Sequence, residues 1–367
     1  MREFTMRPEI MDFESYTPGL TIEQIKELYG LTDVIKLASN ENPLGASPVV
    51  KKVIANHAAS AFRYPQNHSP RLTSELGNML GVDERHIVVG NGSDEIIDML
   101  IRTKCRPGMD NILSYSNNFS MYKLTAKLCG VEYREVPRGD NYALPLDALA
   151  EAVNERTAMV IITSPDNPTG LAASVDDITV LAGVLPENCL LVVDEAYIDF
   201  VWPPEAYTPM QAFDKFSNLV VLRTFSKAYG LAGLRVGYGV MPGFIADYLK
   251  RARIPFTVNL LAEEAAIAAL HDEDFYNATL ETVMRGRDYL RDELQKLGCE
   301  VVPSQSNFLM FTPPAPAQKL FKELLKKGII VRPLASFGLG SSIRVNVGTD
   351  RENKTFIRVL GEVLDNE

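Results

Sequence analysis

The chain has 367 residues with a formal net charge of −10, and 46% of the residues are hydrophobic. This composition is typical of a globular protein, and the length favours two domains or one large domain with an appendage. The acidic balance argues against a sequence-independent nucleic-acid binder, which needs clustered Lys and Arg, but it permits a locally basic pocket for small anions.

The start of the chain is polar and has little periodicity, and we expect residues 1–35 to form an N-terminal arm. This segment lacks the apolar core of a signal peptide, and no run in the chain approaches the ~20 apolar residues of a membrane span. The sequence therefore predicts a cytoplasmic protein without a membrane partner.

Helical stretches and short apolar strands alternate from about residue 46, and we assign residues 36–258 to a large domain. The strands are predicted at Ile87–Val89, Ile112–Leu113, Met159–Thr163, Leu190–Val193, Leu219–Leu222 and Val236–Val240. Apolar strands between helices favour an α/β fold, in which a mostly parallel sheet is sandwiched by helices. Ligands of such sheets bind outside the C-terminal ends of the strands.

The pattern changes near residue 255. A long helical region, Asn259–Leu297, precedes three further strands at Asn307–Phe311, Ile329–Val331 and Ile343–Val347, with prolines in the loops. We expect residues 259–367 to form a smaller α+β domain.

Metal-ligand spacing is missing from the sequence. The four cysteines include no CxxC pair and the four histidines no HExxH motif, so no zinc site is expected. The cysteines are expected to be plain thiols in a reducing compartment.

Asp194 follows directly on an apolar strand, in LLVVDEAYIDF. A carboxylate at the mouth of a buried strand needs a positive partner or a metal. A helix N-cap is one alternative. The acidic motif of a nucleotide hydrolase is another, but that site requires a GxxxxGK[ST] phosphate loop, which the chain lacks.

Lys227 lies in LRTFSKAYGLAGLRVGY, after another strand and close to Ser226 and Arg235. A lone lysine is nearly always a solvated side chain. Nearby cations and apolar flanks lower a lysine pKa, however, and the neutral amine is the nucleophile that imine formation requires.

A Gly-x-Gly turn joins a strand to a helix in IVVGNGSDEII. Free backbone N–H groups at such a helix start suit a phosphate. A dinucleotide-binding GxGxxG motif is not complete, because Glu95 stands in place of its third glycine. A plain glycine turn capped by Ser93 or Asp94 is the alternative, and we assign Asp94 to capping.

Three other side chains have both a functional and a structural interpretation. Asn167, in ITSPDNPTG, can donate a hydrogen bond to a phenolate-type oxygen or belong to a structural turn. Phe119 can stack on a planar ring or be a core aromatic. Arg344 lies on an alternating strand, where an exposed arginine is the simplest interpretation.

Taken together, these segments resemble fold-type I aminotransferases and, within them, the histidinol-phosphate aminotransferase family. The motifs that carry the resemblance are LASNENPLG, RYPQ, VVGNGSDEII, SPDNPTG, VVDEAYIDF, RTFSKAYGLAGLRVGY, PFTVN and SIRVNVGTDREN. They follow one another over about residues 16–353. The resemblance implies pyridoxal 5′-phosphate as the cofactor.

The resemblance also implies a role for each matching residue around this cofactor. Lys227 looks like the Schiff-base lysine that moves the proton, and Asp194 looks like the partner of the pyridinium nitrogen. Tyr197 and Asn167 resemble the pair that bonds the phenolate oxygen, and Phe119 matches the position that stacks on the ring. The phosphate would be held by Gly92, Ser93, Thr224, Ser226 and Arg235, and by Tyr64 from a second subunit, which implies a homodimer.

Substrate contacts follow from the same resemblance. Arg344 looks like the residue that binds the carboxylate of glutamate, while Arg332 and Tyr16 match positions linked to the distal group or phosphate of the substrate. Asn42 lies in the N-terminal segment that borders the site. The implied reaction converts histidinol phosphate and 2-oxoglutarate into imidazole-acetol phosphate and glutamate.

Two departures from the family pattern leave the substrate open. Asp166 stands where relatives often carry asparagine, and SNN precedes Phe119 where a proline-containing turn is common. An aromatic amino-acid aminotransferase and a threonine-phosphate decarboxylase share the cofactor-binding set and stay as alternatives.

Overall fold

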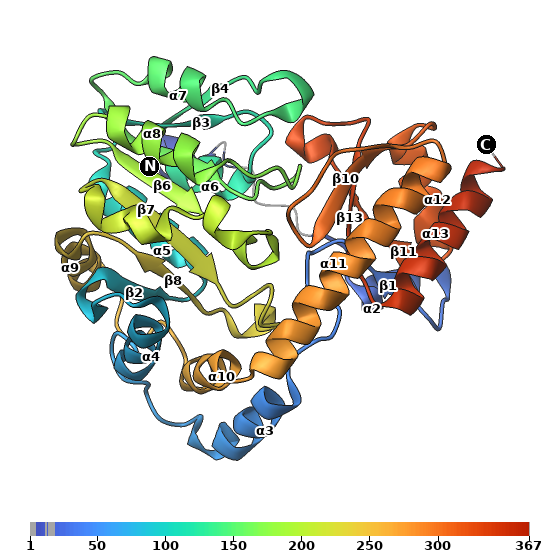
Figure 1. The fold of residues 1–367 in the computed structure, drawn as a ribbon, viewed down its shortest axis with the longest axis horizontal. Coiled ribbons are helices and arrows are strands. Elements are labelled where there is room, and N and C mark those ends of the chain that lie inside the picture. Colours follow the sequence, from blue (N-terminus) through green and yellow to red (C-terminus); the bar gives the residue numbers. More distant parts are fainter. Residues whose placement is uncertain (1–4, 12, 14–18, 367) are drawn as a thin grey trace.

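The computed structural model describes residues 5–11, 13 and 19–366, which form a larger and a smaller unit (Figure 1). The larger unit is built on a seven-stranded sheet in the order β2-β8-β7-β6-β5-β3-β4. Its strands are β2 (Ile87–Gly90), β3 (Asn111–Tyr115), β4 (Glu132–Val136), β5 (Thr157–Thr163), β6 (Leu190–Asp194), β7 (Leu219–Thr224) and β8 (Gly237–Val240). All pairs are parallel except those of β8, which runs antiparallel to β2 and β7. The predicted mostly parallel sheet is confirmed.

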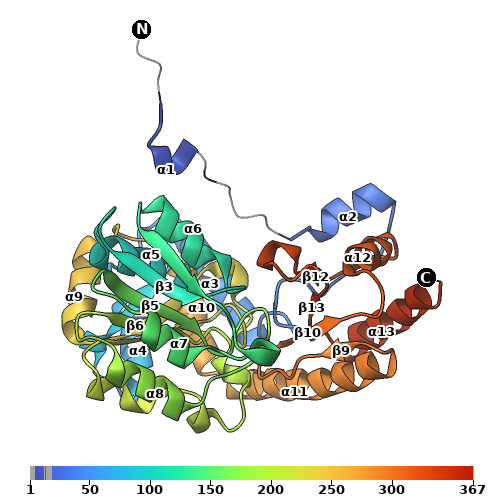
Figure 2. The same cartoon turned by 90° about the horizontal axis from the view of Figure 1, so that it is seen from above.

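Helices cover both faces of this sheet (Figure 2). One face packs against α3 (Pro48–His57), α4 (Pro70–Leu80), α7 (Leu146–Ala152), α8 (Val175–Val184) and α10 (Leu260–Leu270). The other packs against α5 (Ser93–Lys104), α6 (Ser120–Leu128) and α9 (Gly243–Ala252). Val160 and Ile162 of β5 point to the first face and Ile161 to the second, so the strand is apolar throughout.

The sequence prediction missed β4. Among the described strands, β4 lies at the edge of the sheet and pairs with β3 alone. Its residues, EYREV, are exposed or half-buried, so they lack the apolar run by which the central strands were found.

The smaller unit has an antiparallel sheet in the order β12-β13-β10-β9. Its strands are β9 (Glu300–Val301), β10 (Phe308–Thr312), β12 (Arg332–Pro333) and β13 (Ile343–Asn346), and its helices are α11 (Glu273–Lys296), α12 (Ala317–Lys326) and α13 (Asp350–Leu364). Apolar side chains of these three helices pack against β10 and β13. The predicted α+β character is confirmed.

The segment from α2 to β1 packs onto the smaller unit. After α1 (Pro8–Met11), α2 (Ile22–Tyr29) buries Ile25 against Leu325 and Ile330, and β1 (Ile35–Lys36) pairs in parallel with β11 (Ile329–Ile330). The predicted helical region after residue 258 is broken near Asp272 into α10 and α11. Because α10 packs against α3 and α4, we propose that the larger unit extends through α10.

Within the part of the chain that the structure describes, no helix combines the length and the apolar character that crossing a bilayer requires.

Candidate active site

A cavity of about 350 Å³ lies at the C-terminal ends of β5, β6 and β7, between the two units. This volume is within the range of small-molecule sites, about 300–1,000 Å³. Three regions line it: the N-terminal segment, with Gly19 and Ala38–Asn40; the ends of the strands and the turns after them; and Arg332, Phe337 and Arg344 of the smaller unit. The parallel topology thus brings the predicted strand-end residues together.

Lys227 lies in the wall of this cavity, in the turn after β7. Its Nζ donates to the carbonyl of Ser39 across 3.4 Å and lies 5.6 Å from the centre of the Tyr197 ring. Burial, reinforced by the positive charge of Arg344, lowers the Lys227 pKa to about 8. The amine is therefore much easier to deprotonate than a solvated lysine, as a nucleophile or base requires.

Asp194 is the last residue of β6 and is 3% exposed. Its Oδ2 accepts a hydrogen bond from the Tyr122 hydroxyl at 2.7 Å, and its Oδ1 accepts one from the backbone N–H of Ala196 at 3.1 Å. Burial raises the Asp194 pKa to about 6 although the Tyr122 bond lowers it. A cationic ligand group in the cavity would stabilise this carboxylate.

Arg235 forms the basic end of the cavity. Its guanidinium bonds Ser226 Oγ at 3.4 Å and pairs with Asp94 at 3.1 Å. Helix α5 begins after Gly92, and no side chain caps it, so the predicted capping role of Asp94 is wrong. Gly92 has φ +77°, and a Cβ there would lie 2.6 Å from Nη2 of Arg235. Only glycine lets Arg235 approach the start of α5, where N–H groups and a guanidinium suit an anion.

The Tyr197 hydroxyl lies between two asparagine side chains in the cavity wall. Asn40 Nδ2 donates to it at 2.9 Å, and Asn167 Nδ2 lies 3.5 Å from it. Asn167 Oδ1 in turn accepts a hydrogen bond from Arg344 Nη1. One polar network therefore joins the turn after β5 to the smaller unit.

Two arginines enter the cavity from the smaller unit. Arg344 and Arg332 are register partners on β13 and β12. Arg344 is 6% exposed, and its Nη2 donates to the carbonyl of Ala38 at 2.9 Å, so it is not the exposed strand arginine that the pattern alone suggested. Paired guanidinium groups suit carboxylate and phosphate ligands.

The family model for class I and II aminotransferases matches residues 32–360. The chain belongs to this aminotransferase family. A histidinol-phosphate aminotransferase from Nitratidesulfovibrio vulgaris is 49% identical to it over 359 residues, which cover 98% of this chain and 96% of the relative. One from Moorella thermoacetica is 41% identical over 361 residues, covering 98% of this chain and 92% of the relative.

A solved structure shares the fold of this aminotransferase. The histidinol-phosphate aminotransferase from Sinorhizobium meliloti, in complex with pyridoxal-5′-phosphate, superposes with a TM-score of 0.90. Its sequence identity is 26%, and the match covers 100% of this chain and 98% of that one. The two units together therefore have the fold of that enzyme.

Most predicted site residues of the aminotransferase line the cavity. They are Ser93, Phe119, Asn167, Asp194, Tyr197, Thr224, Ser226, Lys227, Arg235, Arg332 and Arg344. Gly92 lies directly behind Arg235. Asn42 lies outside the lining, since its amide donates to the Ala228 carbonyl and to Thr279. Tyr64 is 82% exposed and also lies outside it, and Tyr16 falls outside the described residues.

Sequence reasoning missed several polar residues in or beside the cavity, among them Asn40 and Tyr122. Asn40 lies in the LASNENPLG motif, which was a usable signal. Tyr122 lies on α6 among apolar neighbours and resembles a core aromatic in sequence. Among the described residues, no group of three or more His, Cys, Asp or Glu side chains could hold a metal ion.

Proposed function

We propose that this aminotransferase converts histidinol phosphate and 2-oxoglutarate into imidazole-acetol phosphate and glutamate, with pyridoxal 5′-phosphate as its cofactor. The names of its relatives and the cofactor bound by the Sinorhizobium enzyme support this proposal. The observation that carries it is the convergence of Lys227, Asp194 and Arg235 on one cavity.

The cavity residues fit this cofactor. Pyridoxal 5′-phosphate supplies an aldehyde that condenses with amines and a ring that accepts electrons when the substrate's α-proton leaves. Asp194 would hold the ring nitrogen protonated, because a buried carboxylate with acidic neighbours, here Asp94 and Glu195, is stabilised by a cation. Arg235, Ser226, Thr224 and Ser93 would hold the phosphate at the start of α5.

Lys227 is proposed to bind the cofactor and to move the proton at the substrate's α-carbon. Its pKa of about 8 keeps an appreciable neutral fraction near physiological pH. Tyr197 and Asn167 would bond the ring's phenolate oxygen, and Phe119 would cover the ring. Phe119 already packs edge-on against Tyr122, with ring centres 5.5 Å apart.

Arg344 and Arg332 are proposed to bind the substrate's anionic groups. One pocket must accept a dicarboxylate and an aromatic phosphate monoester in turn, and two adjacent guanidinium groups can serve both. Tyr16 is proposed to contribute from the N-terminal segment. The contacts of Asn42 with Ala228 and Thr279 support an indirect role, in which Asn42 steadies the residues next to Lys227.

We also propose a homodimer in which Tyr64 of the partner subunit reaches the cofactor phosphate. Tyr64 is exposed in the single chain and contacts Phe256, with ring centres 4.9 Å apart. Its hydroxyl is therefore displayed on the surface rather than used in the chain's own core. The cytoplasmic location expected from the sequence stays a prediction.

Substrate preference is tested by comparing transamination of histidinol phosphate with that of phenylalanine, and by assaying decarboxylation of threonine phosphate. Histidinol phosphate should give the highest kcat/KM, and a preference for either other compound would overturn the substrate assignment. Purified protein should be yellow and lose that absorbance in Lys227→Ala, whereas a colourless wild type after addition of pyridoxal 5′-phosphate would overturn the cofactor assignment. Arg344→Gln should slow the glutamate half-reaction by about a hundredfold.

A further inference from the structure

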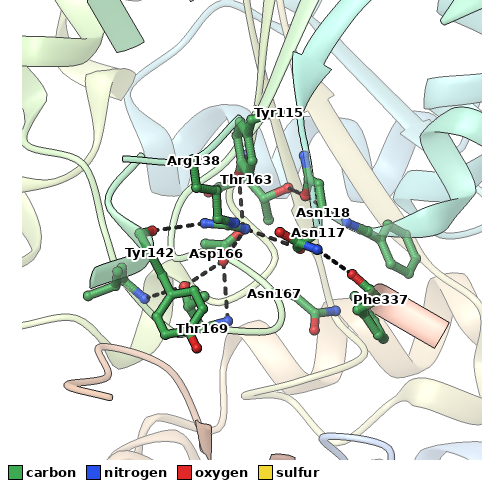
Figure 3. A network of polar contacts seen from close by, with 12 residues as sticks. Tyr115, Asn117, Asn118, Arg138, Tyr142, Thr163, Asp166, Asn167, Thr169 and Phe337 are labelled. Carbon is green, nitrogen blue, oxygen red and sulfur yellow. Dashed lines mark hydrogen bonds and ion pairs between the residues drawn. The ribbon is translucent and has the colours of Figure 1, made fainter. Parts of the chain in front are cut away.

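Arg138 and Asp166 form a buried ion pair just behind the cavity (Figure 3). Their side chains are 5% and 0% exposed, and Nη2 of Arg138 lies 2.8 and 2.9 Å from the two carboxylate oxygens. Neither residue lines the cavity. Because the pair is buried and does not reach the cavity, it can affect the site only through the loops that it bonds.

The guanidinium of Arg138 binds three loops at once. Its Nε donates to the carbonyl of Ser116 at 3.0 Å, its Nη1 to that of Tyr142 at 3.1 Å, and its Nη2 to that of Asn117 at 3.2 Å. It also lies over the Tyr115 ring, 4.6 Å from the centre. Tyr115 ends β3, and Ser116 and Asn117 follow it. Tyr142 lies after the neighbouring strand β4, and Asp166 lies after β5.

The carboxylate of Asp166 is equally well bonded on its own loop. It accepts hydrogen bonds from the Tyr115 hydroxyl at 2.9 Å and from the backbone N–H and the hydroxyl of Thr169. The backbone of Asp166 is paired as well, with Leu171 and Gly170. The turn that contains Asn167 is therefore tied to the loops after β3 and β4 through a single carboxylate.

Both tied loops present residues to the cavity. Asn167 is the next residue after Asp166, and it bonds Arg344 and lies within reach of Tyr197. Phe119 follows the Ser116–Asn118 turn and lines the cavity. Asn117 also donates to the carbonyl of Phe337, another lining residue, which belongs to the smaller unit.

We propose that Arg138 and Asp166 are positioning residues, which set Asn167 and Phe119 at the distances that cofactor binding requires. This inference rests on the proposed function and deepens it. An apolar pair would fill the same space, often at no loss of stability. It could not donate to three carbonyls, so the loops would lose their mutual register while the core stayed folded.

The test separates stability from positioning. Asp166→Asn and Arg138→Met each leave one buried charge without its partner, and both should lower the melting temperature. The double variant Arg138→Met/Asp166→Asn removes both charges and should recover most of that loss. Cofactor affinity should not recover with stability. The double variant should bind pyridoxal 5′-phosphate about tenfold more weakly than the wild type, equivalent to about 1.4 kcal/mol.

Two further measurements report on the loops directly. Amide hydrogen exchange in peptides covering residues 112–120 and 163–171 should be faster in all three variants, with or without the cofactor. The pH midpoint of the visible absorbance of the lysine-bound cofactor should shift, since Asn167 no longer holds its place. The exchange measurement without cofactor needs only folded protein. Thr169→Val, which removes a single bond to Asp166, serves as a milder variant if the others fold poorly.

Asp110→Asn is the matched control. Asp110 is 6% exposed and paired with Arg106, and it precedes β3 at the edge of the sheet opposite the cavity. It should lower stability without changing cofactor affinity, absorbance or exchange in the two loops. Wild-type affinity and absorbance in the double variant would overturn the inference, as would equal changes in Asp110→Asn. A wild type that does not bind the cofactor would instead overturn the proposed function.

Discussion

Tyr122 donates its phenolic hydrogen to Oδ2 of Asp194 across 2.7 Å, and both side chains are buried. The same hydroxyl lies 2.8 Å from Thr163 Oγ1, at the end of the neighbouring strand. Asp194 is thus oriented by a phenol on one face of the sheet. The bond lowers the Asp194 pKa, whereas burial, the larger effect, raises it to about 6.

Replacing Tyr122 with phenylalanine should raise the pKa of Asp194 further, because the bond that favours the charged form is lost. The pH below which cofactor affinity declines should therefore be higher in the variant. Affinity near neutral pH should fall by about tenfold, since a hydrogen bond to a charged group contributes about 1.5–3 kcal/mol. Titration of the apoprotein with pyridoxal 5′-phosphate at several pH values measures this. Tyr248→Phe, at an exposed tyrosine, is the control. If the pH dependence of cofactor affinity is the same as in the wild type, Tyr122 does not act on the charge of Asp194.

Asp194 should destabilise the apoprotein at neutral pH. Its pKa is about 6 in the folded chain against an ordinary value of 3.8, so the folded state binds the proton more tightly. Between these values the stability of the apoprotein falls as pH rises, and the full cost, about 3 kcal/mol, is present above the folded pKa. Asp194→Asn removes this cost, so its advantage in urea unfolding should widen as pH is raised from about 4 to 7.5. If Asp194→Asn is more stable than the wild type by the same free energy at both pH values, Asp194 does not have a raised pKa in the folded apoprotein.

Gly92→Ala should weaken the phosphate end of the site. The added Cβ would meet the Arg235 guanidinium at 2.6 Å, and the backbone has φ +77°. Pyridoxal 5′-phosphate affinity should fall by about tenfold or more through the displaced arginine. Gly81→Ala is the matched control, because Gly81 has φ +66° and nothing within 4 Å. Gly81→Ala should lose about 1–2 kcal/mol of stability, because Gly81 has left-handed helical backbone angles. Gly92→Ala should lose more, because φ +77° with ψ 167° is a conformation almost confined to glycine. Only Gly92→Ala should lose cofactor affinity.

The shared site can be tested by mixing two inactive proteins. Tyr64→Ala and Lys227→Ala subunits, unfolded together and refolded, should form mixed dimers in which one site has both residues and the other neither. Activity should return to about a quarter of the wild-type level, as expected for a two-fold symmetric dimer with random pairing. Each protein refolded alone should stay inactive or nearly so. No gain on mixing would place Tyr64 outside the partner's site.

The sequence predicted the fold correctly where buried strands form continuous apolar runs between helices. The central strands β5, β6 and β7 are apolar on both faces, and helices separate them. Their parallel direction and the position of the site at their C-terminal ends could therefore be predicted. The edge strand β4 could not, because its exposed side chains carry no such pattern. The break between α10 and α11 was also missed, since both segments are good helix formers.

The site could be predicted where its residues lie next to a strand end in sequence. Asp194 and Lys227 do, and both line the cavity. Arg138 and Tyr122 act through contacts with other strands, and no spacing in the sequence reports those. Such contacts depend on strand order, which the sequence pattern leaves open.

The cavity takes its walls from residues as far apart as Gly19 and Arg344. The pairing of Ile35 with Ile329 ties these distant parts together. Contacts between positions so far apart form late in folding, because the intervening chain must be ordered first. During synthesis, therefore, the residues proposed to hold the cofactor can come together on the large sheet before Arg332 and Arg344 have left the ribosome. The wall proposed to bind the substrate is completed only when almost the whole chain has been made and folded.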